Sequence, residues 1–258
     1  FFFHAQAATP DPLWSRGLGD VYKRQKSALP TYELVVPSTG KKIKYRPFVV
    51  KEEKLLLLAL DTKDDKQIEN AIRTLLKGCI QTRIKLEDLT LFDLELIFLN
   101  IRAVSVGEQV ELKVVCKDDN KTEVAYSLDL NDVEVVYPKD HSKKIELTDE
   151  MGIIMKYPGY NEFVSSSIIG DDPSVDNITS VIAECVDQIY DKEEVYDSST
   201  TTKKEFIEFL ENLTTTQFNK IQKFFETAPR VEHRFTVKNP NTGVPSEFVI
   251  TGLSNFFG

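Results

Sequence analysis

Residues 86–108 constrain the fold more than any other stretch, because they form the most apolar segment of that length in the chain. Thr90 and Asp93 have the spacing of an N-terminal capping pair, and Gly107 supplies a stop signal, so the pattern predicts one helix. At about 100° per residue, its apolar side chains fall on two faces. One face holds Leu91, Leu94, Ile97, Phe98 and Ile101, and the other holds Phe92, Leu96 and Leu99.

This helix is expected to be covered on two sides, because an ordinary surface helix has a single apolar stripe. Two thin polar stripes separate the apolar faces, and they consist of Asp93 with Asn100 and Glu95 with Arg102. The first interpretation is a central core helix. The alternative is that one face is kept for a partner subunit, and the candidate partner interface is then Phe92, Leu96 and Leu99.

The composition is that of an ordinary globular protein, with 41% hydrophobic and 28% charged residues among 258. This length allows one large domain or two small ones. The net charge of −9 argues against a nucleic-acid-binding surface or an anionic-membrane surface as the main binding partner. No run of about 18 apolar residues is present, so no transmembrane helix is expected.

The two ends of the sequence differ from the rest. Residues 1–25 show no sustained helical or strand period, and their last part resembles a translated sequencing adapter, so we expect a non-native leader without a fold. Residues 26–169 are expected to form an α+β domain. The polar, proline-containing segment 170–176 predicts a boundary, followed over 170–258 by a helical block with a terminal hairpin that packs on the first domain as one unit. The ending at G-L-S-N-F-F-G suggests truncation.

The remaining patterns predict an α+β protein in which a central two-faced helix and amphipathic helices pack against antiparallel hairpins. Hairpins or strands are predicted at 31–48 (with its turn at Gly40), 109–116, 122–130, 133–137, 145–157 and 231–253. Helices are predicted at 51–60, 66–80, from Asp176 or Asn177 to Tyr190, at 203–213 and at 218–227. Thr202 with Glu205, and Thr214 with Gln217, are capping boxes for the last two.

Cysteine and histidine are too sparse to predict a metal site. Cys79, Cys116 and Cys185 are an odd number without a C-x-x-C pair, which fits a reducing cytoplasm and argues against a disulfide scaffold. Outside the leader the histidines are His141, in a charged linker and expected at the surface, and His233, in the last hairpin. No set of three or four ligands can be assembled from these residues.

No catalytic or cofactor-binding residue is predicted either. The chain beyond the leader lacks a glycine-rich phosphate loop, a nucleophile elbow and an H-E-x-x-H motif. The adjacent carboxylates Asp118 and Asp119 are better explained as solvated turn residues than as an acid/base pair, which needs convergence on a cleft. Aromatic residues near the end are core candidates first and interaction candidates second, namely Phe218, Phe224, Phe225, Phe256 and Phe257.

The run G-C-I-Q-T-R-I-K-L-E-D-L-T-L-F-D-L-E-L-I-F-L-N-I-R-A-V-S-V-G-E, followed by a hairpin and I-E-L-T-D-E-M-G-I-I-M-K-Y-P, resembles the baseplate hub assembly proteins of T4-like tailed phages. The order of elements is also similar, from the P-S-T-G-K hairpin to the final G-L-x-x-F-F, so the resemblance covers nearly everything from Lys26 to Gly258. The F-D-L-E to S-V-G-E helix is its most specific part.

The resemblance implies a structural or assembly protein of the phage baseplate hub, which is not an enzyme, needs no cofactor and contacts other hub proteins. It implies assembly in the host cytoplasm, with or without retention in the virion tail, and it allows an oligomer. Family members often carry cysteine pairs on the hairpins, which suggests a metal or a stabilising cluster there. In this sequence only Cys116 lies in the hairpin at 109–130, and the last hairpin has no cysteine. The alternative hypotheses are a metal- or ligand-binding module without catalysis, and a hydrolase whose carboxylates meet in one pocket.

Overall fold

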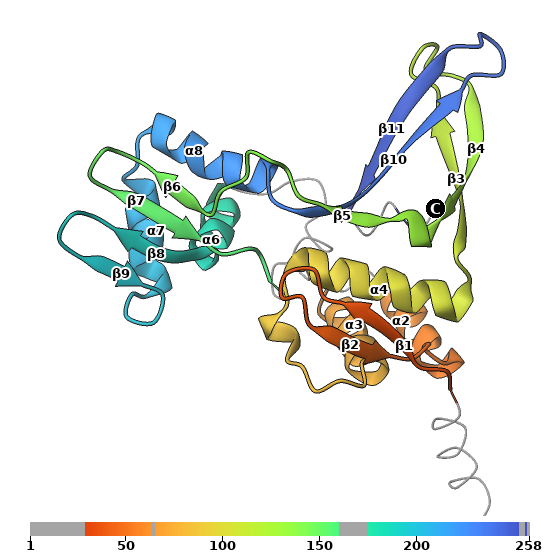
Figure 1. The fold of residues 1–258 in the computed structure, drawn as a ribbon, viewed down its shortest axis with the longest axis horizontal. Coiled ribbons are helices and arrows are strands. Elements are labelled where there is room, and N and C mark those ends of the chain that lie inside the picture. The colour runs from red at the N-terminus through yellow and green to blue at the C-terminus, as the bar shows by residue number, and fades with distance from the viewer. Residues whose placement is uncertain (1–28, 63–64, 160–174, 253–255, 257–258) are drawn as a thin grey trace, which may run out of the picture.

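The computed structural model describes residues 29–62, 65–159, 175–252 and 256, drawn as a coloured ribbon in Figure 1. The predicted leader, most of the predicted boundary at 170–176 and Phe257 lie outside the described residues. Helices and several antiparallel sheets make up the described chain, which confirms the predicted α+β class.

The first part of the chain is a hairpin followed by three helices. These elements are β1 (Tyr32–Val35), β2 (Lys42–Tyr45), α2 (Val50–Thr62), α3 (Asp65–Cys79), the short 3-10 turn η1 (Leu86–Asp88) and α4 (Leu91–Val106). Gly40 in the β1–β2 turn has a φ of 68°, a left-handed conformation that glycine adopts without strain, as its predicted place in the turn requires. The predicted hairpin and the three helices of this part are confirmed.

Two long hairpins form the second part of the fold, although they come from distant parts of the sequence. The first is β3 (Gln109–Val115) with β4 (Glu123–Asp129), followed by the 3-10 turn η2 (Leu130–Asp132) and β5 (Glu134–Val136). The second is β10 (Arg230–Lys238) with β11 (Pro245–Thr251), and β5 adds to its edge at β10. In Figure 1 the two hairpins lie above α4, and their tips are next to each other at the upper right. The rings of Tyr126 on β4 and Phe235 on β10 stack with centroids 3.8 Å apart.

The third part is a four-stranded antiparallel sheet covered by helices, at the left in Figure 1. Its elements are β6 (Lys144–Glu146), β7 (Gly152–Met155), α6 (Val175–Glu184), β8 (Val186–Tyr190), β9 (Val195–Asp197), α7 (Lys203–Glu211) and α8 (Thr215–Glu226). Both predicted capping boxes, at Thr202 and at Thr214, are present at the starts of α7 and α8. Of the predicted aromatic core, Phe224 and Phe256 are buried, and Phe218 and Phe225 are half-buried.

The core is divided into three clusters, and α4 separates two of them. One face of α4, including Leu94, Ile97 and Ile101, packs against the β1–β2 hairpin and α3. Its opposite face packs against residues of β3, β4 and β10. The third cluster fills the space between the four-stranded sheet and α6–α8. The interpretation of α4 as a core helix covered on two sides is therefore confirmed.

The helix predicted to run from Asp176 or Asn177 to Tyr190 is wrong in its second half. α6 ends at Glu184, and Val186–Tyr190 form strand β8, which lies between β7 and β9 in the sheet. Val186 and Ile189 fit both a helical spacing and a short buried strand, and pairing with β7 decides between these alternatives. α6 begins at Val175, so both predicted capping residues lie inside its first turn.

Strand pairs join the segments on the two sides of residue 170. β7 pairs with β8 in the four-stranded sheet, and β5 pairs with β10 in the three-stranded sheet. The strand predicted at 133–137 is thus a separate strand, whose partner lies about 95 residues further along the chain.

Candidate interaction surface

The predicted partner interface lies against the chain's own strands. Phe92 and Leu99 are only 3% and 1% exposed, inside the cluster that α4 forms with β3, β4 and β10, and Leu96 is half-buried beside them. The ring of Phe92 also meets that of Tyr157 edge-on, with centroids 5.3 Å apart. A partner could reach this face only if the strands moved away. The partner contact predicted for these three residues stays a prediction.

Asp93 explains the polar stripe that interrupts these apolar faces. Its carboxylate is fully buried and accepts hydrogen bonds from the backbone N–H and the hydroxyl of Thr90, and the bond from the N–H belongs to the predicted capping box. It also accepts from the backbone N–H of Ser38 at 3.0 Å and from the Ser38 hydroxyl. A buried carboxylate with four donors is satisfied, so Asp93 fixes the β1–β2 turn to the start of α4.

A cluster that we call the hairpin clasp joins the tips of the two long hairpins. The amide nitrogen of Asn239, which is fully buried, donates to both carboxylate oxygens of Asp118 and to one of Asp119, each at 3.0 Å. The hydroxyl of Thr242 also donates to Asp118, and that of Thr122 donates to Asp119. The clasp therefore comprises Asp118, Asp119, Thr122, Asn239 and Thr242.

Electrostatics in the clasp follow from these donors. Hydrogen bonds from Asn239 and Thr242 lower the pKa of Asp118 below its ordinary value. Those from the side chain and backbone of Thr122 hold the pKa of Asp119 far below its ordinary value. Both residues sit in the β3–β4 turn, as predicted. Their contact with Asn239 could not be read from the sequence, because no local pattern shows that turns about 120 residues apart meet.

His141 is expected at the surface, and in the structure it is half-buried among aromatic rings. Its ring packs against those of Tyr157 and Phe224, with centroids 5.4 and 5.0 Å away, and its Nδ1 is 3.0 Å from the Thr227 hydroxyl. Burial, and then the charge of Lys143, lower the pKa of His141 below its ordinary value. The charged local sequence does not indicate that His141 packs against aromatic rings, because Tyr157 and Phe224 come from other segments of the chain.

The other candidate ligands stay apart. His233 lies on β10, as predicted, with Nε2 2.9 Å from the Tyr126 hydroxyl. Cys79, Cys116 and Cys185 are all buried. In the described part of the chain, no three His, Cys, Asp or Glu side chains gather as ligands for a metal ion. None of the described helices is both long and apolar enough to cross a membrane.

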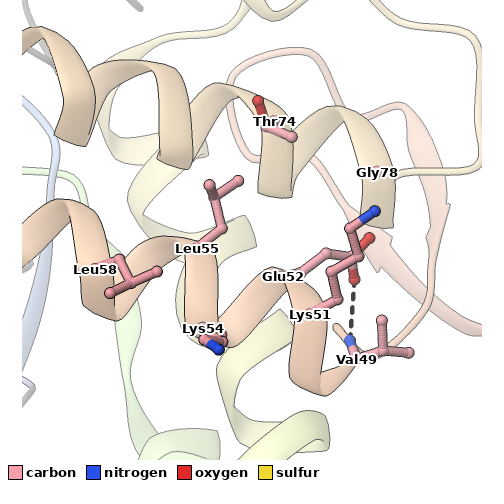
Figure 2. A pocket seen from close by; sticks show the side chains of 8 residues that line it. All are labelled: Val49, Lys51, Glu52, Lys54, Leu55, Leu58, Thr74 and Gly78. Atoms are coloured by element: carbon pink, nitrogen blue, oxygen red, sulfur yellow. Dashed lines mark hydrogen bonds between the residues drawn. The ribbon is translucent and has the colours of Figure 1, made fainter.

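Several exposed apolar side chains lie on α2. Leu55, Leu57 and Leu58 are 42%, 59% and 55% exposed, and Val50 at the start of the helix is 78% exposed. Beside them, a groove of about 380 Å³ runs between α2 and α3. Figure 2 shows its lining, which consists of Val49, Lys51, Glu52, Lys54, Leu55, Leu58, Thr74 and Gly78.

The end of this groove is shaped by Glu52 and Gly78. The Glu52 carboxylate forms a two-point ion pair with Arg46, at 2.6 and 3.0 Å, and accepts from the backbone N–H of Val49 at 2.9 Å. A Cβ on residue 78 would lie 2.9 Å from this carboxylate, so glycine allows the last turn of α3 to approach α2 closely. The sequence K-E-E-K-L-L-L-L-A-L predicted the helix but not which leucines stay exposed.

Comparison with known proteins identifies the family to which this fold belongs. Neither the curated proteins nor the solved structures include a match. The family model described as "T4 bacteriophage base plate protein" matches residues 29–258, which include every helix and strand described above. The chain therefore belongs to the T4 bacteriophage base plate protein family.

Proposed function

We propose that this protein is a structural or assembly component of the baseplate hub in a T4-like tailed phage, and that it works by binding other hub proteins and not by catalysis. The observation that carries this proposal is the family match over residues 29–258. Assignment to the hub rests on the resemblance of the F-D-L-E to S-V-G-E helix, now α4, to hub assembly proteins.

The contacts of the polar residues support a structural role. Asp93, within F-D-L-E, ties the β1–β2 turn to α4, and Asp118 and Asp119 tie together the tips of two hairpins. The carboxylates of these residues are thus occupied by donors from the protein itself. The exposed leucines of α2 provide an apolar surface of the kind that binds other proteins.

The partners are expected to be other baseplate hub proteins, met in the host cytoplasm when the late proteins of the phage assemble. The protein is then either retained in the virion tail or released before the tail matures. A negative net charge fits a role in protein–protein contact better than one in nucleic-acid binding.

Co-expression with phage proteins tests this proposal. The tagged chain is produced with each hub, wedge and tail-tube protein encoded in the same genome, and complexes are measured by size-exclusion chromatography with light scattering. A stable complex with at least one hub protein, and none with the tube protein, is expected. Failure to bind any baseplate protein would contradict the proposal. Stoichiometric zinc in the purified protein would favour the metal-binding module instead.

A further inference from the structure

We infer that the groove between α2 and α3 binds an acidic amphipathic helix of another baseplate protein. This inference rests on the proposed function and names the surface and the chemistry of the contact. It starts from Leu55 and Leu58, which are three residues apart on α2, line the same groove and are 42% and 55% exposed. A row of exposed leucines beside a hollow is typical of a surface that a partner covers.

The walls of the groove favour a helical segment of the partner over an extended one. Both walls are helices, whose backbone groups are already hydrogen-bonded within α2 and α3. An extended peptide would find no free strand edge to pair with, whereas a helix satisfies its own backbone and needs only apolar anchors. Thr74 on α3 has a small side chain and leaves room for such anchors, whereas the space beside Gly78 is filled by the Glu52 carboxylate at the end of the groove.

The lysine side chains at the groove favour an acidic partner helix. Lys51 and Lys54 line it, and the charge of Glu52 is matched by its ion pair with Arg46. Lys77, next to Gly78 on α3, is exposed as well. The groove is therefore locally positive in a protein of net charge −9. Two copies facing each other through this groove would bring lysines against lysines, which disfavours a symmetric dimer here.

Binding measurements on exposed-residue variants test the inference. Each purified baseplate protein of the same phage is titrated against the full chain, and the dissociation constants of Leu55→Glu and Leu58→Glu are compared with that of the parent. Glutamate has a helix propensity close to that of leucine, so α2 is expected to remain folded, which urea denaturation checks. The matched control is Leu57→Glu on the same helix, because Leu57 is 59% exposed but does not line the groove.

We expect each groove variant to weaken binding by about 30-fold, and the control by no more than about twofold. Lys51→Glu with Lys54→Glu should weaken it by about tenfold, whereas Lys113→Glu with Lys204→Glu, on other elements, should not. Leu58→Lys should bind at least about threefold more tightly than Leu58→Glu, since the partner is acidic.

The outcomes separate this inference from the function on which it rests. If the parent chain binds no baseplate protein, both fail. If it binds one and the groove variants bind equally well, only the groove is contradicted. If Leu58→Glu abolishes self-association of the chain and not a hetero-complex, the occupant is a second copy, which also contradicts the inference.

Discussion

The backbone N–H of Ser38 donates a hydrogen bond to the carboxylate of Asp93 across 55 residues of sequence, with the nitrogen and oxygen 3.0 Å apart. One side chain therefore caps α4 and also holds the β1–β2 turn. The P-S-T-G turn and the F-D-L-E motif, which the sequence presents as separate features, are in this way parts of one contact.

Asp93→Ala is expected to lower the free energy of unfolding by about 3 kcal/mol, because four hydrogen-bond donors of Ser38 and Thr90 lose their buried carboxylate acceptor. Urea denaturation measures this, and Asp88→Ala, at an exposed position of η1, should change it by no more than about 0.5 kcal/mol. Ser38→Ala should lower the free energy of unfolding by less in the Asp93→Ala background than in the parent chain. Fully additive effects of the two substitutions would contradict the proposed coupling.

A negative charge at residue 239 is expected to destabilise the hairpin clasp. Asn239→Asp replaces the donor by a carboxylate facing Asp118 and Asp119, so at pH 7 we expect a loss of about 2 kcal/mol of stability. Denaturation and hydrogen exchange of the two hairpins measure it, with Asn131→Asp in η2 as the control. An equal loss in both variants would show that the clasp contributes nothing specific.

Acid should weaken the same clasp in the parent chain. Because the folded state lowers the pKa of Asp118 and Asp119, it binds fewer protons than the unfolded chain, and their stabilising effect is lost as pH falls below the ordinary carboxyl range. NMR titration of the side-chain carboxyl carbons should show the pKa of Asp118 rising towards its ordinary value in Asn239→Ala. An unchanged titration would contradict the role of Asn239.

Titration of His141 is expected to make the stability of the fold depend on pH near neutrality. Its folded-state pKa is lowered by burial and by Lys143, so stability should be complete above its ordinary pKa and decrease as pH falls from about 7.5 to 5.5. His141→Phe preserves the packing against Tyr157 and Phe224 and should remove this slope, and Lys143→Gln should reduce it. Urea midpoints at several pH values measure it, and a slope that survives in His141→Phe assigns the effect to another group.

Glu232 is expected to stabilise β10 through its two arginine partners. It is 1% exposed and forms ion pairs with Arg230 and Arg234. Burial raises its pKa, but the hydrogen bonds and charges of the arginines outweigh this and hold the pKa below the ordinary value. Since both arginines are partly solvated, Glu232→Gln should cost about 2 kcal/mol, against less than about 0.5 kcal/mol for the exposed Glu247→Gln. Equal urea midpoints would contradict this.

Features set by neighbouring residues could be predicted from the sequence. The capping pair of Thr90 and Asp93, the two apolar faces of α4 and the glycine in the β1–β2 turn depend on short-range spacing, and all are present in the structure. The overall α+β class followed from such elements.

Features set by distant residues could not be predicted. The run around Val186 fits a helix or a strand, and pairing with β7 decides in favour of the strand. The half-buried position of His141 depends on rings from other segments, and the contact of Asn239 with Asp118 joins distant turns. The groove beside Leu58 depends on how α3 packs on α2, so four successive leucines do not reveal which ones remain exposed.

The role in baseplate assembly can be tested by electron microscopy of tails from cells infected with a phage that carries a stop codon early in this gene. We expect that baseplates with complete hubs are not formed, and that supplying the parent chain from a plasmid restores them together with infectious particles. Normal baseplates and an undiminished yield of infectious phage in the absence of the chain would contradict it.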